Sequence, residues 1–436
     1  MRIPAPALLA AMVVSLAGCG SSSGGGISVA DGRDTGISKD CAAAAAAAAD
    51  FYLPPEPLPP GRPGDVLRCQ ESYTTLLSAV AKGTRIMYLS TDVHGAPIAV
   101  TGAVFEPLAP WSGPGERPLV GYTLGTHGQG DQCAPSRLLA DVAHVDPLDP
   151  MLEYEAPLML DMLAQGWAIV VTDYQGLGTP GHHAWLSRAA EAHANIDAVR
   201  AARRLPGTGI PADGPLAFGG YSQGGNAAGA TAELLSSYGP ELHPVGIYVG
   251  APPRDIPELA QYDDGGLASG FMGYYLNGLA ANYPEVEAVL DERLNDAGKT
   301  LLRDVAGQCL FGTSLAYGYR QSSSFTVSGE SFSELLQSDE LRDLVARDHL
   351  GNVAPSMPVL LATGSNDEIV PPAGVRQLFA DWCARGATAE LYDLPLPLIP
   401  IGSGAGHVAN YPIAYAKFRG WLQDRFAGVP AASTCP

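Results

Sequence analysis

Three residues of this chain have the types, and the order along the sequence, that nucleophilic catalysis by a serine requires. Ser222 stands within Gly-Tyr-Ser-Gln-Gly, Asp367 stands within Ser-Asn-Asp-Glu, and His407 is the only histidine beyond residue 349. A serine hydroxyl is a weak nucleophile unless a base accepts its proton, and an acid must orient that base. The order serine, acid, histidine is that of α/β-hydrolases and differs from those of chymotrypsin-like and subtilisin-like chains. These residues therefore predict an α/β-hydrolase with a Ser-His-Asp triad.

The segment around Ser222 predicts the strand, sharp turn and helix that expose a nucleophilic serine above a sheet. Residues 215–220 form a short apolar run typical of a buried strand, and residues 223–237 are rich in the Ala and Leu of a helix. Gly220 and Gly224 would permit the strained backbone of such a turn. A second matching pentapeptide at 20–24 lies in a Gly/Ser stretch with no strand or helix beside it, so we treat that match as incidental.

Asp367 is chosen as the acid because of its position. It follows the apolar run 358–364, which predicts a central parallel strand, and α/β folds place their sites at the carboxyl ends of such strands. The neighbouring Glu368 could substitute for it. Asp381 lies in a helical pattern and Asp393 in the next strand, so both are weaker candidates.

The other parts of the site are expected in two loops and at the serine turn. His407 ends the glycine-rich stretch 402–407, and a C-terminal helix is expected only after it. The tetrahedral intermediate needs two preorganised donors for its oxyanion. One should be the backbone N–H of Gln223, and the other should come from the loop after an early strand, from His127 or Gly128. The alternative for His127 is a loop histidine without a role.

The amino terminus predicts export. Residues 1–18 combine one positive charge with an apolar stretch and end in Leu-Ala-Gly before Cys19, the pattern of a signal peptide with a bacterial lipobox. We therefore expect lipidation of Cys19, a flexible tether over residues 19–50, and a place at the cell surface or outer membrane. The alternative is ordinary secretion. No other apolar run approaches the roughly 20 residues that span a bilayer.

The remaining cysteines suit an exported protein. Removing Cys19 from the seven leaves an even number, and disulfides persist outside the cytosol. The sequence alone does not choose among the possible pairings. No C-x-x-C spacing occurs, so neither a zinc site nor a redox motif is expected, and no cofactor is implied.

The body of the chain predicts one large domain with an insertion. Strand and helix patterns alternate over residues 51–253 and again over 351–436, which favours a mostly parallel sheet with helices on both faces. Residues 254–350 have only helical patterns, and we interpret them as a cap over the active site. Five of its apolar residues are expected to line an acyl tunnel, with packing inside the cap as the alternative; they are Phe271, Met272, Tyr274, Tyr275 and Leu276.

The charge of the chain excludes some partners. With 45 acidic and 25 basic residues the formal net charge is −20, which disfavours nucleic acids and anionic membrane surfaces.

Several motifs together resemble the secretory lipase family. They are Asp50-Phe51-Tyr52 with its Pro-rich continuation, Pro63-Gly-Asp-Val-Leu-Arg68, Cys133-Ala-Pro-Ser136, Val171-Thr-Asp-Tyr-Gln-Gly-Leu-Gly178 and Gly-Tyr-Ser-Gln-Gly-Gly at 220–225. The resemblance implies a capped α/β-hydrolase that acts on carboxylic esters, often acylglycerols, without a cofactor. It implies the triad Ser222, Asp367 and His407.

The resemblance carries three further expectations. It places the oxyanion residue at His127, where fungal members have an aspartate, so a backbone donor is expected there rather than a side chain. It implies a disulfide between Cys133 and Cys309 that ties cap to core, which leaves Cys41–Cys69 and Cys383–Cys435 as guesses for the rest. The lipobox points to a bacterial member of the family.

Three functions compete. A lipase or esterase is the first, and a serine exopeptidase on the same fold is the second. Peptidases of this fold usually bring a propeller or a paired-carboxylate site for the substrate amine, and the sequence indicates neither. The third is a surface-binding protein without activity, which would normally have lost a member of the triad.

Overall fold

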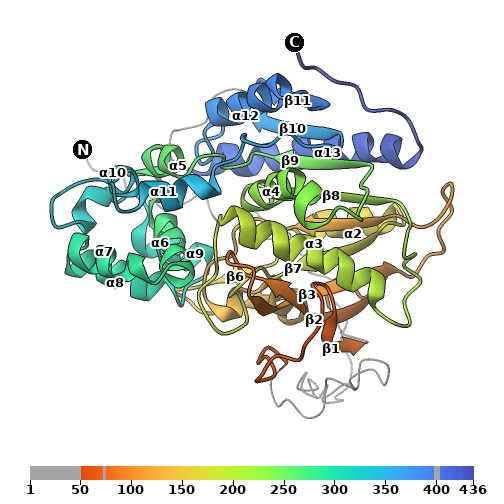
Figure 1. Ribbon diagram of the computed structural model, residues 1–436, viewed down its shortest axis with the longest axis horizontal. Helices are drawn as coiled ribbons and strands as arrows, with labels where there is room; N and C mark the ends of the chain where they lie inside the picture. Colours follow the sequence, from red (N-terminus) through yellow and green to blue (C-terminus); the bar gives the residue numbers. More distant parts are fainter. Residues whose placement is uncertain (1–50, 72–74, 397–402) are drawn as a thin grey trace, which may run out of the picture. The chain divides into compact units, whose positions relative to one another are not determined.

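A single mixed sheet forms the centre of the molecule (Figure 1). The computed structural model describes residues 51–71, 75–396 and 403–436. In order across the sheet the strands are β1 (Val66–Glu71), β2 (Ala81–Thr91), β3 (Pro97–Pro107), β7 (Ala168–Thr172), β4 (Leu119–Thr123), β8 (Leu216–Tyr221), β9 (Gly246–Gly250), β10 (Val359–Gly364) and β11 (Ala389–Leu394). The last six strands of this order run parallel, and β1, β2 and β3 join antiparallel at one edge. The predicted α/β-hydrolase architecture is confirmed.

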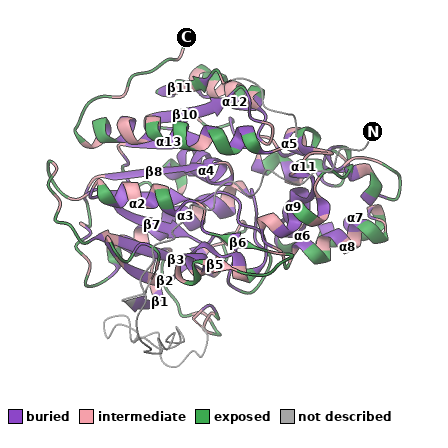
Figure 2. Cartoon of the chain, turned by 180° about the vertical axis from the view of Figure 1, so that it is seen from behind, coloured by how far each residue is buried: buried purple, intermediate pink, exposed green. Residues whose placement is uncertain are grey.

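Helices cover both faces of this sheet. They are α1 (Pro135–Asp141), α2 (Ala156–Ala164), α3 (Arg188–Arg204), α4 (Gln223–Tyr238), α12 (Pro372–Ala384) and α13 (Ala405–Phe426). Figure 1 shows α3, α4 and α12 on one face, and Figure 2 shows α2 and α13 on the other, where they contact each other. Five of the parallel strands, β7, β4, β8, β9 and β10, are buried along their whole length because helices cover both of their faces.

A block of helices leaves the sheet after β9 and returns before β10. It consists of α5 (Ile256–Asp263), α6 (Met272–Asn282), α7 (Glu285–Arg293), α8 (Asp296–Val305), α9 (Leu310–Tyr317), α10 (Phe332–Leu336) and α11 (Arg342–Val345). We call residues 256–348 the helical insert. Local signals start several of its helices: the Asp255 side chain accepts from Glu258 N, and Ser331 with Glu334 forms a capping box.

The insert has its own hydrophobic core, which Trp185 and Leu186 of the main domain join. Tyr274 and Tyr275, two of the residues expected to line an acyl tunnel, are buried in this core. The Tyr274 hydroxyl donates to Thr313 Oγ1 (2.6 Å) and the Tyr275 hydroxyl to Asp348 Oδ2 (2.8 Å). The alternative, packing within the insert, therefore holds for these two tyrosines.

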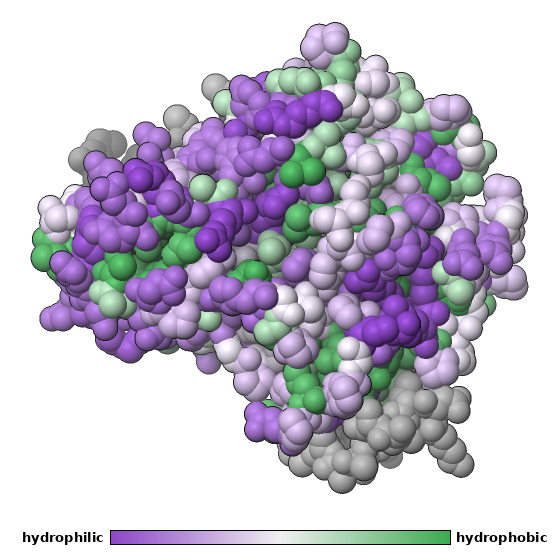
Figure 3. Space-filling view, in the orientation of Figure 1, coloured by the Kyte–Doolittle hydropathy of each residue, from purple (hydrophilic) through white to green (hydrophobic). Residues whose placement is uncertain are grey.

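The outer surface of the insert is polar. Figure 3 shows hydrophilic side chains over much of the part where α7 and α8 lie, and α7 exposes Glu285, Glu287, Asp291 and Glu292. None of the helices in the described part of the chain combines the length and apolar character that crossing a bilayer takes. The predicted signal peptide, Cys19 and the tether to residue 50 lie outside the described residues.

Two disulfide predictions are confirmed, Cys133–Cys309 and Cys383–Cys435. Cys69 is disulfide-bonded as well, and Cys41, the partner we expected for it, lies outside the described residues.

Candidate active site

Ser222 lies at the sharp turn between β8 and α4 and has a backbone that most residues avoid. Its φ of 62° and ψ of −123° lie in a region that costs a non-glycine residue conformational energy. The backbone N–H of Ser222 donates to Gly250 O (2.9 Å), which ties the turn to β9. A Cβ on Gly224 would lie 2.0 Å from Thr123 O, so only glycine lets the helix start so close to β4. This is the turn that holds a serine hydroxyl above a sheet.

Asp367 and His407, far apart in the sequence, are brought into contact. Asp367 Oδ2 lies 2.8 Å from His407 Nδ1, and both side chains are buried. The other oxygen, Oδ1, accepts the backbone N–H groups of Ile369 (3.0 Å) and Val370 (2.8 Å). Because the carboxylate can only accept, Nδ1 carries the proton, and Nε2 of a neutral His407 is left with a lone pair.

Tyr221, the residue before the serine, contacts His407 of this pair. The ring of Tyr221 is 5.0 Å from the imidazole of His407, centroid to centroid, and its hydroxyl donates to His407 O (2.9 Å). Among the described residues no hydrogen bond joins the Ser222 hydroxyl to His407. Catalytic hydrogen bonds of this kind are often long without substrate and shorten when it binds.

Glu368, the alternative acid, does something else. Its carboxylate accepts from Ser403 Oγ (2.8 Å), from Gly406 N (3.1 Å) and from His407 N (3.3 Å). These two N–H groups belong to the first turn of α13, where a negative charge is stabilising. The helix therefore begins at Ala405, and the expectation that His407 ends a loop ahead of the helix is wrong.

The side-chain amide nitrogen of Gln223 has two hydrogen-bond partners. Nε2 donates to Glu191 Oε1 (2.9 Å) and lies 2.8 Å from His183 Nε2. Burial lowers the pKa of His183 to about 4, so its imidazole is neutral, and Nδ1 donates to Gln175 O (3.2 Å). His183 Nε2 can then accept the second N–H of Gln223. Sequence reasoning missed His183 and Glu191, and no motif marks either residue.

His127 is buried, and both nitrogens of its imidazole already have hydrogen-bond partners other than an oxyanion. Nδ1 lies 2.8 Å from Gly125 O, and Nε2 lies 3.0 Å from Glu153 Oε2. Burial lowers the pKa of His127, but the charge and hydrogen bond of Glu153 outweigh it and raise the value to about 9. Both ring nitrogens are engaged, so at His127 only the backbone is left to face an oxyanion.

Comparison with known proteins identifies the family of this chain. The family model for secretory lipase matches residues 148–434, a span that contains Ser222, Asp367 and His407. The chain belongs to the secretory lipase family.

The individual relatives of this chain are distant in sequence. It is 27% identical over 385 residues to "Probable inactive lipase MT1628" of Mycobacterium tuberculosis, covering 87% of this chain and 82% of that protein. It is 27% identical over 317 residues to "Secreted triacylglycerol lipase LIP5" of Malassezia furfur, covering 72% and 79%. The crystal structure of Candida antarctica lipase A in its closed state shares the fold, with a TM-score of 0.76, 22% identity and coverage of 88% and 87%. Because one relative is called inactive, activity has to be argued from the residues of this chain.

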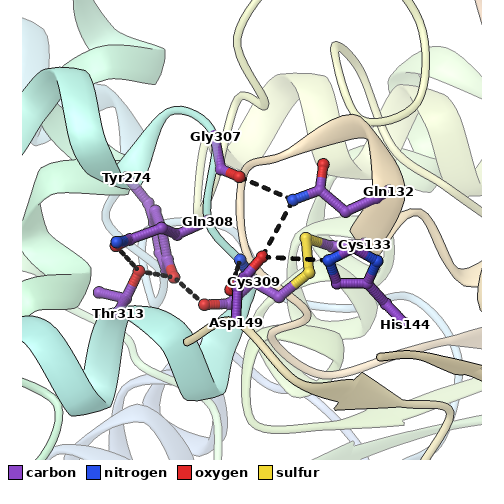
Figure 4. Close-up of a disulfide and its surroundings, with 9 residues drawn as sticks. All are labelled: Gln132, Cys133, His144, Asp149, Tyr274, Gly307, Gln308, Cys309 and Thr313. Atoms are coloured by element: carbon purple, nitrogen blue, oxygen red, sulfur yellow. Dashed lines mark hydrogen bonds and ion pairs between the residues drawn. A yellow bond between two sulfur atoms is a disulfide. The ribbon is translucent and has the colours of Figure 1, made fainter. Parts of the chain in front are cut away.

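The helical insert is linked to the loop of His127 by a disulfide and by hydrogen bonds. Figure 4 shows Cys309, at the start of α9, joined to Cys133 of the main domain, with Asp149 accepting the backbone N–H of Cys309 (2.7 Å). Three backbone hydrogen bonds add to this link, from Leu310 N to His127 O (2.8 Å), from Gln129 N to Gln308 O (2.9 Å) and from Gly130 N to Gln308 O (3.2 Å). The insert and the loop therefore hold each other in place.

Proposed function

We propose that this chain hydrolyses carboxylic esters through an acyl-enzyme on Ser222. The observation that supports the proposal is the buried Asp367–His407 pair, 2.8 Å apart, which contacts Tyr221, the residue before a serine in the strained turn after β8. A serine at such a turn, a base oriented by an acid and a loop with free backbone donors form the constellation for acyl transfer. The family assignment supports an ester or lipid as the substrate.

The same residues act in both halves of the proposed reaction, the formation and the hydrolysis of the acyl-enzyme. Ser222 Oγ attacks the carbonyl carbon while its proton moves to His407 Nε2, and Asp367 stabilises the resulting imidazolium. The carbonyl oxygen becomes an oxyanion, which the backbone N–H of Gln223 and a second N–H from the His127–Gly128 loop stabilise. His407 then gives the proton to the leaving alkoxide, and the alcohol departs. Water attacks the acyl-enzyme by the same route, and the carboxylic acid leaves.

The helical insert, with two flanking residues on each side (254–350), is proposed as the cap that shapes the acyl site. Its chain leaves at the carboxyl end of β9, the sheet edge where the serine turn lies, and residues 349–358 then lead to the amino end of β10. The Tyr262 hydroxyl of α5 also donates to Asp367 O (2.7 Å), which places α5 beside the proposed acid. A cap in this place should favour flexible apolar acyl chains over charged peptides.

The substrate profile tests both proposals. We expect hydrolysis of p-nitrophenyl butyrate and no hydrolysis of aminoacyl p-nitroanilides. Across p-nitrophenyl esters, kcat/KM should rise from acetate toward medium chains by up to about fourfold per methylene, since each buried methylene contributes roughly 0.8 kcal/mol. Cleavage of the anilides in preference to the esters would favour the exopeptidase. A profile that falls steadily from acetate would indicate a shallow pocket without a cap.

We also propose that the chain is exported and anchored by lipid at Cys19. The support is the Leu-Ala-Gly-Cys pattern after an apolar stretch. Cells that express the wild-type chain with a clickable fatty acid should label it, and the Cys19→Ser variant should carry no label. A wild-type chain that is found free in the medium and unlabelled would instead show ordinary secretion.

A further inference from the structure

The His127 loop is also held by side chains that are not part of the proposed triad. The side chains of three consecutive residues, 153–155, each contact one residue of the loop segment 125–127. Glu155 Oε1 accepts from Gly125 N (2.6 Å), the Tyr154 hydroxyl donates to Thr126 O (3.0 Å), and Glu153 Oε2 lies 3.0 Å from His127 Nε2. We call residues 153–155 the loop clamp. The loop clamp belongs to the main domain. The insert contacts the same loop separately, at His127 O.

The clamp is electrostatically expensive, and fold stability alone does not explain it. Glu153, Glu155 and His127 are each at most 2% exposed. Taking charged groups out of water costs several kcal/mol each, and a packed apolar pair of the same volume is often as stable. Buried ion pairs that persist at a proposed reaction centre point instead to a requirement for geometry and charge at that place.

The contacts of His127 define its charged state. Gly125 O can only accept, so Nδ1 must donate to it. Nε2 faces the carboxylate of Glu153, and an N–H there completes an imidazolium with two charge-assisted hydrogen bonds. The ring of Tyr154 stacks on the imidazole with centroids 4.9 Å apart and planes 17° apart, which further favours a cation.

The other titratable groups around His127 do not supply this charge. Burial raises the pKa of Glu155 to about 7, with a contribution from Glu153, and its Oε2 accepts from Tyr122 OH (3.0 Å) and from the Tyr411 hydroxyl. Burial raises the pKa of Tyr154 well above its usual value. His183, which senses the charge of His127, is kept neutral by burial. Loss of the proton of His127 is therefore the change expected in this group of residues on the alkaline side.

We propose that Glu153 is a positioning residue for the oxyanion hole: it holds His127 as an imidazolium, and the doubly bonded imidazole fixes the backbone N–H groups that face the oxyanion. The proposal rests on the proposed function, because it assigns the second oxyanion donor to this loop. Glu153 does not touch the substrate. Its effect should appear in kcat, since the oxyanion forms only in the transition state, and KM should change little.

Glu153→Gln tests the proposal, because it keeps the shape of the side chain and removes its charge. With p-nitrophenyl butyrate we expect kcat to fall by about 10- to 100-fold at pH 8, with KM within about twofold. A histidine whose pKa is raised is charged below that pKa and neutral above it, so wild-type kcat should fall as the pH rises through about 9. Without Glu153 the burial that lowers the pKa of His127 is opposed less, so the proton is lost at lower pH. The fall through about pH 9 should then be absent from the variant, and the ratio of variant to wild-type kcat should rise toward one above that pH.

Two further variants keep the test decisive. Glu233→Gln is a matched control, since Glu233 is also buried and bonded to Arg188, Gly351 N (2.6 Å) and Trp382 Nε1 (2.9 Å), away from the loop. It should lower the melting temperature and leave kcat at the wild-type value at every pH. Tyr154→Phe removes only the hydrogen bond to Thr126 O and should lower kcat less than Glu153→Gln, and it serves as the test if Glu153→Gln does not fold.

The possible outcomes distinguish a failure of the loop clamp proposal from a failure of the proposed function. Wild-type kcat in folded Glu153→Gln and in Tyr154→Phe would overturn the proposal, as would a loss in Glu153→Gln that is the same at every pH. If Ser222→Ala hydrolyses the ester as fast as the wild type does, the proposed function fails, whatever the clamp variants show.

Discussion

Ser222→Ala is expected to lower kcat for p-nitrophenyl butyrate by about 10⁴- to 10⁶-fold, because the attacking oxygen is gone and only binding and oxyanion stabilisation remain. The fold should be unaffected. Alanine keeps the Cβ, so the strain of a φ of 62° is the same as for serine, and no hydrogen bond of the serine hydroxyl is lost within the described residues. Steady-state kinetics together with the melting temperature by circular dichroism measure both effects.

A serine on the following helix provides the control. Ser236 is exposed on α4, and its hydroxyl has one hydrogen-bond partner in the described part of the chain, Ser356 Oγ (3.0 Å). Ser236→Ala should keep wild-type kcat. Substantial ester hydrolysis by folded Ser222→Ala would reject this serine as the nucleophile.

The parts of the fold that local sequence determines were predicted closely. Residues 215–220 and 223–237 were predicted as strand and helix, and β8 and α4 occupy Leu216–Tyr221 and Gln223–Tyr238. The apolar run, the glycines and the Ala-rich helix are all adjacent in sequence, so the signal is complete within one window. The runs 84–91 and 98–105, joined by the turn residues 92–95, likewise predict a strand pair from local sequence, and they form most of β2 and β3. Strand β1 was missed, because Arg68, Gln70 and Glu71 interrupt its apolar pattern at the edge of the sheet.

The site was only partly predictable, because some of its contacts exist only in the folded chain. Chain order and strand position led to Asp367 and His407, and the structure places them in contact. The role of Glu368 could not be read from the sequence, since it depends on the first N–H groups of α13 reaching a loop 38 residues earlier. For the same reason the loop clamp and the His183–Glu191 contacts of Gln223 had no sequence signal. Buried polar partners are chosen by tertiary packing, and no local period marks them.

Asp367→Asn is expected to lower kcat by about 10³- to 10⁴-fold, and the hydrogen bonds of the acid explain why so similar a residue fails. Oδ1 accepts two backbone N–H groups, from Ile369 and Val370, so the amide oxygen of an asparagine would take that position. Its NH₂ group would then face His407 Nδ1 and donate to it. The imidazole proton would move to Nε2, where it blocks acceptance of the serine proton. His407→Ala should lose at least as much, since it removes the base itself.

Glu368→Gln is the matched comparison, because the two carboxylates are adjacent and both contact the segment of His407. Ser403 Oγ and Gly406 N donate to Oε1 and His407 N donates to Oε2, so the one oxygen that glutamine keeps retains the first two hydrogen bonds and the third is lost. We expect a loss of kcat of about tenfold or less, with a lower melting temperature because the start of α13 loses a negative charge. Kinetics of the two variants at pH 8, each with its thermal melt, decide between the carboxylates. Wild-type activity in Asp367→Asn with an inactive, folded Glu368→Gln would move the acid by one position. The structure argues against that exchange, because an imidazole can be oriented only by the group that touches its Nδ1, and that group is Asp367.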